Sequence, residues 1–193
     1  MLAEKLKNRN LILASASPRR QQFIKDLGLS FEVRLKPVEE NFPETLKGAE
    51  IAEFLAELKA KPLLKDLNPE DILLTGDTIV WHENQVLHKP KNKDQAFEML
   101  KKLSGNSHQV ISAACLATSK RKVLVHDSTT VYFKNLNKEE INYYIENFNP
   151  YDKAGGYGIQ EWIGKTGIHK IEGSFYTVMG MPIDKVYDVL KEI

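Results

Sequence analysis

Residues 10–28 of the chain read NLILASASPRRQQFIKDLG, a run that changes from a strand pattern to a helix pattern near its centre. The apolar run NLILAS at residues 10–15 predicts a buried strand. Ser17 and Pro18 then predict a helix start, because serine caps a helix and proline fits its first position. The helix has one apolar face, and Gly28 is its expected end. A strand that leads directly into an amphipathic helix is typical of α/β proteins.

The same alternation continues along the chain. Further strands are predicted at residues 31–35, 72–80, 110–118, 123–133 and 168–171, and further helices at residues 49–65, 92–103, 137–148 and 183–193. Residues 36–47 are polar and residues 151–160 are glycine-rich, so both predict loops. Two long strands follow one another without a helix between them, which parallel strands could not do. We therefore expect an α/β fold with a mixed, twisted central sheet flanked by helices, in a single domain over residues 1–193.

Composition and charge exclude several classes of protein. The 193 residues suit one domain, and 27 Lys and Arg against 26 Asp and Glu give a net charge of +1. This balance argues against a strongly basic nucleic-acid binder, and no apolar run approaches the length of a membrane span. The single cysteine, Cys115, reads as a core residue and allows no internal disulfide. We expect a cytoplasmic protein with neither a nucleic-acid nor a membrane partner.

The segment SASPRR at residues 15–20 is the first candidate site. The first turn of a helix offers unpaired N–H groups and positive partial charge, so phosphate binds there readily. The hydroxyls of Ser15 and Ser17 and the guanidinium groups of Arg19 and Arg20 would add hydrogen-bond donors. The alternative is a helix cap followed by arginines that face solvent. Arginine in a first turn opposes the helix dipole, which favours an anion at this place.

A second candidate site lies in TGDT at residues 75–78, near the end of the apolar run 72–74. Ligands of open α/β sheets collect beyond the carboxyl ends of strands. Asp77 must be solvated, paired or bound to a metal there, and the alternative is a plain turn residue. Glu39 and Glu40 in the polar loop gain a role only if the fold brings one of them beside Asp77, where two carboxylates could share Mg²⁺.

Two weaker signals are Lys89, a surface lysine by default, and the glycine-rich run DKAGGYGIQ at residues 152–160. Glycines let a backbone pass close to a ligand, but this run matches neither the P-loop nor the dinucleotide fingerprint. The five histidines show no zinc-site spacing.

Taken together, these segments resemble the Maf family, also called septum formation inhibitor Maf-like proteins. The resemblance follows chain order through LILASASPRRQQFIKDLGLSFEV, LAELKA, TGDTIV, LHKP, MLKKLSGNSHQV, DKAGGYGIQ and GSFYTVMGMP. It implies two lobes around a nucleotide-binding cleft, as in the inosine triphosphatase-like fold. It also implies a house-cleaning enzyme that hydrolyses nucleoside triphosphates to monophosphate and pyrophosphate, with a divalent metal. The KAGGYGIQ form of the loop resembles the subfamily that acts on dTTP and UTP.

The resemblance also implies roles for individual residues. Asp77 matches the family's catalytic proton acceptor, and Arg19, Thr78 and Gln160 match positions tied to nucleotide preference. The positions implied around the phosphates and the metal fall on Ser15, Ser17, Arg19, Arg20, Glu40, Lys59, Lys89 and Lys153. Glu161 departs from the pattern, because many relatives have glycine after the glutamine.

On this basis we expect Mg²⁺, with Mn²⁺ as the alternative, held by Asp77 and Glu40, while Asp77 activates the water that attacks the α-phosphorus. Whether Asp77 is base, metal ligand or both stays open. Also open are a non-enzymatic nucleotide-binding regulator of cell division, a monophosphatase, and a pyrophosphatase of other base preference such as 7-methyl-GTP. The expected partner is a small nucleotide, and the sequence allows a homodimer.

Overall fold

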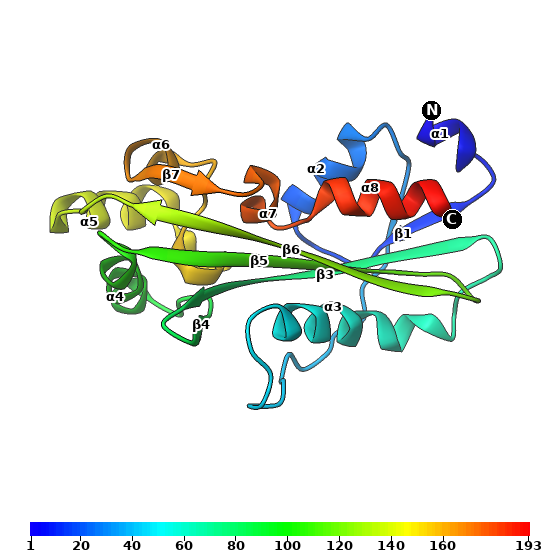
Figure 1. Cartoon of the computed structure of the whole chain (residues 1–193), viewed down its shortest axis with the longest axis horizontal. Helices are drawn as coiled ribbons and strands as arrows, with labels where there is room; N and C mark the ends of the chain where they lie inside the picture. The colour runs from blue at the N-terminus through cyan, green and yellow to red at the C-terminus, as the bar shows by residue number, and fades with distance from the viewer. The chain divides into compact units, whose positions relative to one another are not determined.

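A computed structural model describes all 193 residues and contains one seven-stranded sheet with helices packed against it (Figure 1). The strands are β1 (Asn10–Leu13), β2 (Glu32–Val33), β3 (Asp71–His82), β4 (Gln85–Leu87), β5 (Ser107–Ala117), β6 (Lys122–Phe133) and β7 (Ile168–Glu172). Their order is β2-β1-β3-β5-β6-β7, with β4 paired to β3. β1 pairs in parallel with β2 and β3, whereas β4 and β7 pair antiparallel with β3 and β6. The predicted α/β fold with a mixed sheet is confirmed.

The helices are α1 (Leu2–Lys5), α2 (Pro18–Asp26), α3 (Ala49–Leu64), α4 (Lys93–Leu103), α5 (Lys138–Phe148), α6 (Trp162–Thr166), α7 (Phe175–Met179) and α8 (Ile183–Glu192). Two 3₁₀ turns, Pro150–Asp152 and Ala154–Gly156, lie in the predicted glycine-rich loop. No helix combines the length and the apolar character that a membrane span requires.

The chain divides into two compact units. Unit 1 comprises residues 1–77, 112–127 and 180–193, and unit 2 comprises residues 78–111 and 128–179. Strands β3, β5 and β6 each contribute residues to both units.

In unit 1, α3 lies on one side of the strands, and α2 and α8 lie on the other (Figure 1). The centre of the apolar run that predicted β1 is fully buried, since Ile12 and Leu13 are 0% exposed. The predicted apolar face of α2 is also buried, through Phe23 and Ile24. Burial of both faces of β1 explains why its sequence is a continuous apolar run instead of an alternating one.

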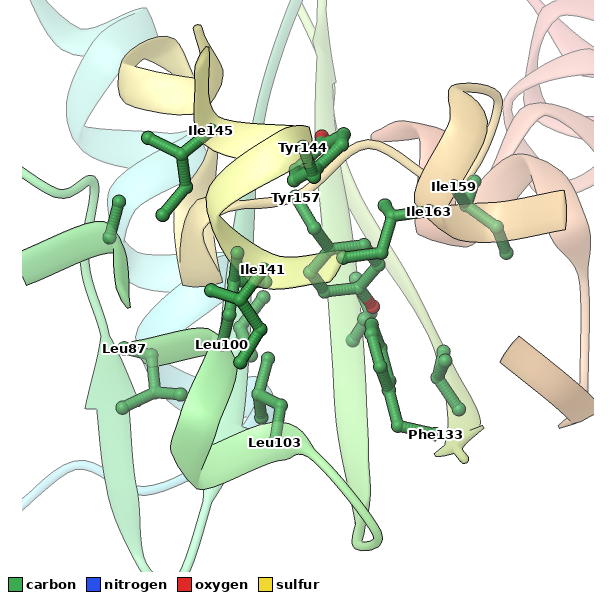
Figure 2. Packing of buried hydrophobic residues seen from close by; sticks show 14 residues of the cluster. Leu87, Leu100, Leu103, Phe133, Ile141, Tyr144, Ile145, Tyr157, Ile159 and Ile163 are labelled. Carbon is green, nitrogen blue, oxygen red and sulfur yellow. The ribbon is translucent and has the colours of Figure 1, made fainter. Parts of the chain in front are cut away.

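Unit 2 has its own core, built where α4 and α5 meet the glycine-rich loop. Figure 2 shows Ile141 and Tyr144 of α5 together with Leu100 of α4 in this cluster. Tyr157 of the loop packs its edge against Phe133, with ring centroids 5.1 Å apart. The loop is therefore part of the packed core of its unit.

Several element boundaries differ from the predictions. β3 runs on to His82, two residues past its predicted end at residue 80, and Asp77 lies inside this strand. β2 has only two residues, and α3 continues through Pro62 in its last turn. The four short elements α1, β4, α6 and α7 had no predicted counterpart.

Candidate active site

The serine-rich turn after β1 forms the N-terminus of α2, as its sequence indicates. Ser15 is 6% exposed, and its Oγ accepts a hydrogen bond from the backbone N–H of Ser17 at 3.2 Å. The Ser17 hydroxyl in turn caps α2 by accepting from the N–H of Arg20 at 3.5 Å, and Pro18 takes the first helical position. The positive end of α2 thus starts directly beside the end of β1, where it can receive an anion.

Arg20 is built into unit 1. Its Nε donates to the carbonyl oxygen of Gly180 at 2.9 Å, and its Nη1 donates to that of Gly76 at 2.7 Å. Burial lowers the pKa of the Arg20 guanidinium below its ordinary value, and the opposite charge of Asp77 only partly offsets this shift. A Cβ on Gly76 would lie 2.9 Å from the carbonyl oxygen of Ala113, so glycine is required there. Arg20 therefore braces the part of β3 that carries Asp77, in addition to the phosphate contact that the sequence suggests.

Asp77, Lys59 and Glu40 form an ion-pair cluster in unit 1. The Lys59 ammonium donates to Asp77 Oδ1 at 2.5 Å and lies 3.0 Å from Glu40 Oε1. The side chain of Asp77 is 10% exposed and that of Lys59 is 19% exposed, whereas that of Glu40 is 52% exposed. The fold thus brings the loop glutamate and Asp77 to the same ammonium group. Two carboxylates and one ammonium leave this cluster with one net negative charge.

The backbone explains how Asp77 comes to face this cluster. The parallel pairing of β1 with β3 ends at Leu13 and Leu74, so Asp77 lies beyond the carboxyl end of its parallel neighbour. Between Leu74 and Asp77, the Thr75 hydroxyl donates to the carbonyl oxygen of Ala56 in α3 at 2.6 Å. This buried bond fixes β3 against the helix that carries Lys59. The rule that ligands gather past the carboxyl ends of parallel strands therefore still applies to Asp77.

The remaining candidate residues lie in unit 2: Thr78, Lys89, Lys153 and Gln160. Thr78 is half-buried within β3, and Lys89 is exposed after β4. The N–H of Gly155 donates to the carbonyl oxygen of His88 at 3.1 Å, which ties the glycine-rich loop to the segment that carries Lys89.

Lys153 is a buried cation with partners of its own. Its residue is 8% exposed. Its ammonium donates to Asp152 Oδ1 at 2.7 Å and lies 3.2 Å from Glu161 Oε1. The two carboxylates more than balance its single positive charge. A phosphate contact by Lys153 stays a prediction, and a phosphate would have to compete with these partners.

Gln160 occupies the corner of a tight turn. The N–H of Glu161 donates to the carbonyl oxygen of Gly158 at 3.0 Å, which closes the turn over Ile159 and Gln160. Ile159 is buried in the core of unit 2, while Gln160 is half-buried and its side-chain amide has no hydrogen bond to the protein. The amide oxygen and NH₂ group are therefore free to serve a ligand.

Two residues of this region, Tyr144 and Glu161, had no role assigned from the sequence. The buried hydroxyl of Tyr144 contacts both Gly158 and Glu161. Helical periodicity marks Tyr144 as a core residue of α5, but it gives no sign of where its hydroxyl points. The unusual glutamate at position 161 was the one available signal, because it departs from the family pattern next to Gln160.

Comparisons with known proteins show the family to which the chain belongs. The family model of Maf-like proteins matches residues 10–193. A dTTP/UTP pyrophosphatase of Flavobacterium johnsoniae is 56% identical over 98% of this chain and 98% of that protein. Proteins of the same name from Flavobacterium psychrophilum and Christiangramia forsetii are 51% and 49% identical, over 97% and 100% of this chain and 96% and 98% of theirs. Identity at this level over nearly the whole length places the chain in the Maf family of proteins.

Proposed function

We propose that this chain hydrolyses dTTP and UTP to the nucleoside monophosphate and pyrophosphate. The observation that carries the proposal is the cluster of Asp77, Lys59 and Glu40, which lies in the same unit as the α2 turn. Relatives about half identical over their whole length carry the name dTTP/UTP pyrophosphatase, which supports the same reaction.

The α2 turn supplies the phosphate contacts in this proposal. A triphosphate carries several negative charges, and guanidinium groups bind phosphate oxygens through charge-assisted hydrogen bonds. Arg19 is partly exposed in the first turn of α2, and Arg20 places a second positive charge beside β3. The Ser15 and Ser17 hydroxyls fix the turn that presents these groups. These contacts would orient the phosphates and stabilise negative charge as it develops on them.

Asp77 is the group that we assign to the attacking water. Its carboxylate is largely buried and is oriented by Lys59 through the 2.5 Å bond to Oδ1. A carboxylate fixed in this way can accept the proton of a water molecule aligned with the α-phosphorus, so that pyrophosphate leaves on the opposite side. Lys59 would neutralise charge on the phosphates once they enter the cluster.

The donor set fits a divalent metal. Mg²⁺ is usually held by one or two carboxylates together with substrate phosphates and water. Asp77 and Glu40 provide two carboxylates, and both of them contact the Lys59 ammonium. No group of three or more His, Cys, Asp and Glu side chains is arranged to hold a metal. We therefore propose Mg²⁺, with Mn²⁺ as a substitute, held by Asp77, Glu40 and the substrate. Such an ion supplies charge neutralisation on the phosphates and lowers the pKa of water that it binds.

Gln160 is the residue that we assign to the base. Its amide oxygen can accept the N3–H of uracil or thymine while its NH₂ group donates to O4. No protein group holds the amide in one orientation, so the same side chain can turn over and satisfy cytosine. We therefore expect UTP and dTTP to be good substrates, CTP to be intermediate, and ATP and GTP to be poor.

A nucleotide panel tests the proposal. Purified protein with Mg²⁺ should release pyrophosphate, and no orthophosphate, from UTP and dTTP. Release of orthophosphate from UMP, with UTP left intact, would indicate the monophosphatase, and a preference for 7-methyl-GTP would indicate the other base preference. Binding of UTP without any turnover would favour the non-enzymatic regulator. We also propose a cytoplasmic location, in keeping with the single buried thiol of Cys115, and the homodimer stays a prediction for light scattering to check.

A further inference from the structure

One buried hydroxyl ties both ends of the turn that carries Gln160. The Tyr144 hydroxyl accepts a hydrogen bond from the N–H of Gly158 at 2.9 Å and donates one to Glu161 Oε2. Gly158 and Glu161 are the first and last residues of the turn, and they also bond to each other through the backbone. Tyr144 lies on α5, fourteen residues before Gly158, so this contact joins the turn to a separate and rigid element.

The Glu161 carboxylate is held on both of its oxygens. Oε1 lies 3.2 Å from the Lys153 ammonium, and Oε2 accepts from Tyr144. The Glu161 side chain is 18% exposed, and Tyr144 is 0% exposed. Burial and the hydrogen bond to Glu161 raise the pKa of Tyr144, so its hydroxyl keeps the proton that it donates. A buried network with every member paired is rigid, because losing one bond leaves another group unpaired.

The glutamate also folds back over the turn. A Cβ on Gly158 would lie 2.9 Å from Glu161 Cδ, so the carboxylate occupies the space that any other residue at position 158 would need. Ile159 anchors the turn from the other side by packing into the core of unit 2. Within this turn, the Gln160 side chain is the one left without a protein partner. The backbone of Gln160 is therefore fixed, while its amide is free to rotate.

We propose that Tyr144 and Glu161 are positioning residues for base selection, which hold the turn so that the Gln160 amide meets the base edge. This inference rests on the proposed function, in which Gln160 reads the base. Neither residue needs to touch the nucleotide. A turn that loses its tie to α5 would sample several positions, and the amide would then meet the base edge only part of the time. We therefore expect kcat/KM to fall for nucleotides whose base contacts Gln160 and to stay unchanged for the others.

The test compares Tyr144→Phe with Tyr143→Phe. Both variants lose a hydroxyl from α5, but Tyr143 is 48% exposed and its hydroxyl makes no hydrogen bond to the turn. The readout is the ratio of kcat/KM for UTP to kcat/KM for GTP. We expect Tyr144→Phe to lower this ratio about three- to tenfold, because the turn loses both hydrogen bonds of the Tyr144 hydroxyl, and Tyr143→Phe to leave it unchanged.

The Gln160→Ala background separates positioning from general damage. If Tyr144 acts through Gln160, Tyr144→Phe will no longer change the UTP to GTP ratio once Gln160 is alanine. Glu161 gives an independent pair of variants. Glu161→Gln retains an oxygen for the Tyr144 hydroxyl and should preserve most of the ratio, whereas Glu161→Ala should lose as much of it as Tyr144→Phe.

Three results would overturn the inference. One is an equal loss of kcat/KM for UTP and GTP in Tyr144→Phe, another is the same ratio change in the Gln160→Ala background, and the third is a Glu161→Ala enzyme with the wild-type ratio. In each case the proposed function still stands if the wild type prefers UTP and Gln160→Ala reduces that preference. A wild type without pyrimidine preference, or one that Gln160→Ala does not affect, would instead refute the base reading itself and this inference with it.

Discussion

Replacement of Lys59 by methionine would remove the ammonium group between Asp77 and Glu40 and keep most of the aliphatic side chain. The main loss is the 2.5 Å bond to Asp77, because the pair has side chains only 10% and 19% exposed. The contact to Glu40 matters less, since that side chain is 52% exposed. Lys59→Met therefore leaves the largely buried Asp77 carboxylate without the ammonium that bonds to it, and Arg20 is a positive charge that remains near it.

The size of the effect follows from this partial burial. Removing one member of a fully buried ion pair costs about 3–5 kcal/mol, whereas an exposed pair contributes about 0–1 kcal/mol. The Asp77–Lys59 pair lies between these limits, so we expect a loss of about 2 kcal/mol in the free energy of unfolding. For a chain of this size that corresponds to a melting temperature lower by about 4–8 °C.

Thermal melts of metal-free protein, with a double-mutant cycle, provide the assay. Asp77→Asn should remove most of the benefit of Lys59, so the double variant should be more stable than the sum of the single losses predicts. Lys93→Met is the matched control, because Lys93 pairs with Glu146 at 2.6 Å but both side chains are more than half exposed. Its melting temperature should change by less than about 4 °C.

A divalent ion adds a second readout to the same melts. In Lys59→Met, Mn²⁺ can approach Asp77 and Glu40 without competing against the ammonium, so it should raise the melting temperature more than in the wild type. A Lys59→Met protein as stable as the wild type, or strictly additive losses in the cycle, would refute the ion-pair argument. Equal Mn²⁺ stabilisation of both proteins would show that the ammonium and the metal do not share these carboxylates.

Two further predictions concern the arginines and a buried histidine. Arg19→Ala and Arg20→Ala should each lower kcat/KM for UTP about ten- to a hundredfold, because a charge-assisted hydrogen bond contributes about 1.5–3 kcal/mol; unchanged kinetics in both variants would make them structural residues only. Arg20→Ala should also lower the melting temperature, since the carbonyl groups that Arg20 serves lose a donor, whereas Arg19→Ala should lower it less. Burial lowers the pKa of His108 to about 3, below its ordinary value near 6.5, so its contribution to stability is complete above pH 6.5 and is lost as the pH falls toward 3. The free energy of unfolding should drop by about 1.4 kcal/mol per pH unit in this window. Denaturant titrations at pH 7 and pH 5 measure this drop, which should be smaller in His108→Gln than in the wild type. Equal drops in the two proteins would contradict the assignment to His108.

Local patterns in the sequence were sufficient to predict β1 and α2, the two elements on either side of the turn in residues 15–20. The apolar run of β1 and the Ser17–Pro18 start of α2 depend on neighbouring residues only, and both are confirmed. The helix predicted at residues 137–148 is also present as α5, and a capping box opens it, with Asn137 and Glu140 bonded to each other's backbone. Caps and periodicity act over a few residues, which is why a single sequence reveals them.

The hairpin at the end of β3 could not be predicted in the same way. β4 pairs with the end of β3 through a two-residue turn at Glu83 and Asn84, both with positive φ. The pairs that usually mark such a turn are Asn-Gly and Asp-Gly, and Glu83–Asn84 is neither. The partner strand β4 was therefore missed, and β3 runs two residues past its predicted end at residue 80. Helices α6 and α7 have five residues each, too few for apolar periodicity to show.

The contacts that define the site are long-range. Glu40, Lys59 and Asp77 come from a loop, a helix and a strand, and no spacing rule relates them. The family resemblance brought these residues together as candidates, but the physical analysis of the sequence alone left Glu40 conditional on the fold and gave Lys59 no partner. The pattern of α5 gave no sign of where the Tyr144 hydroxyl points, because packing against Phe148 already accounts for a buried tyrosine there.

The most direct test of the central claim is hydrolysis of UTP in ¹⁸O-labelled water, followed by mass spectrometry of both products. Attack of water on the α-phosphorus predicts one labelled oxygen in UMP and none in pyrophosphate, and Asp77→Asn should abolish most of this turnover while its fold and UTP binding persist. Label in the pyrophosphate, orthophosphate as a product, or an Asp77→Asn enzyme with near wild-type kcat in the presence of Mg²⁺ would contradict the account.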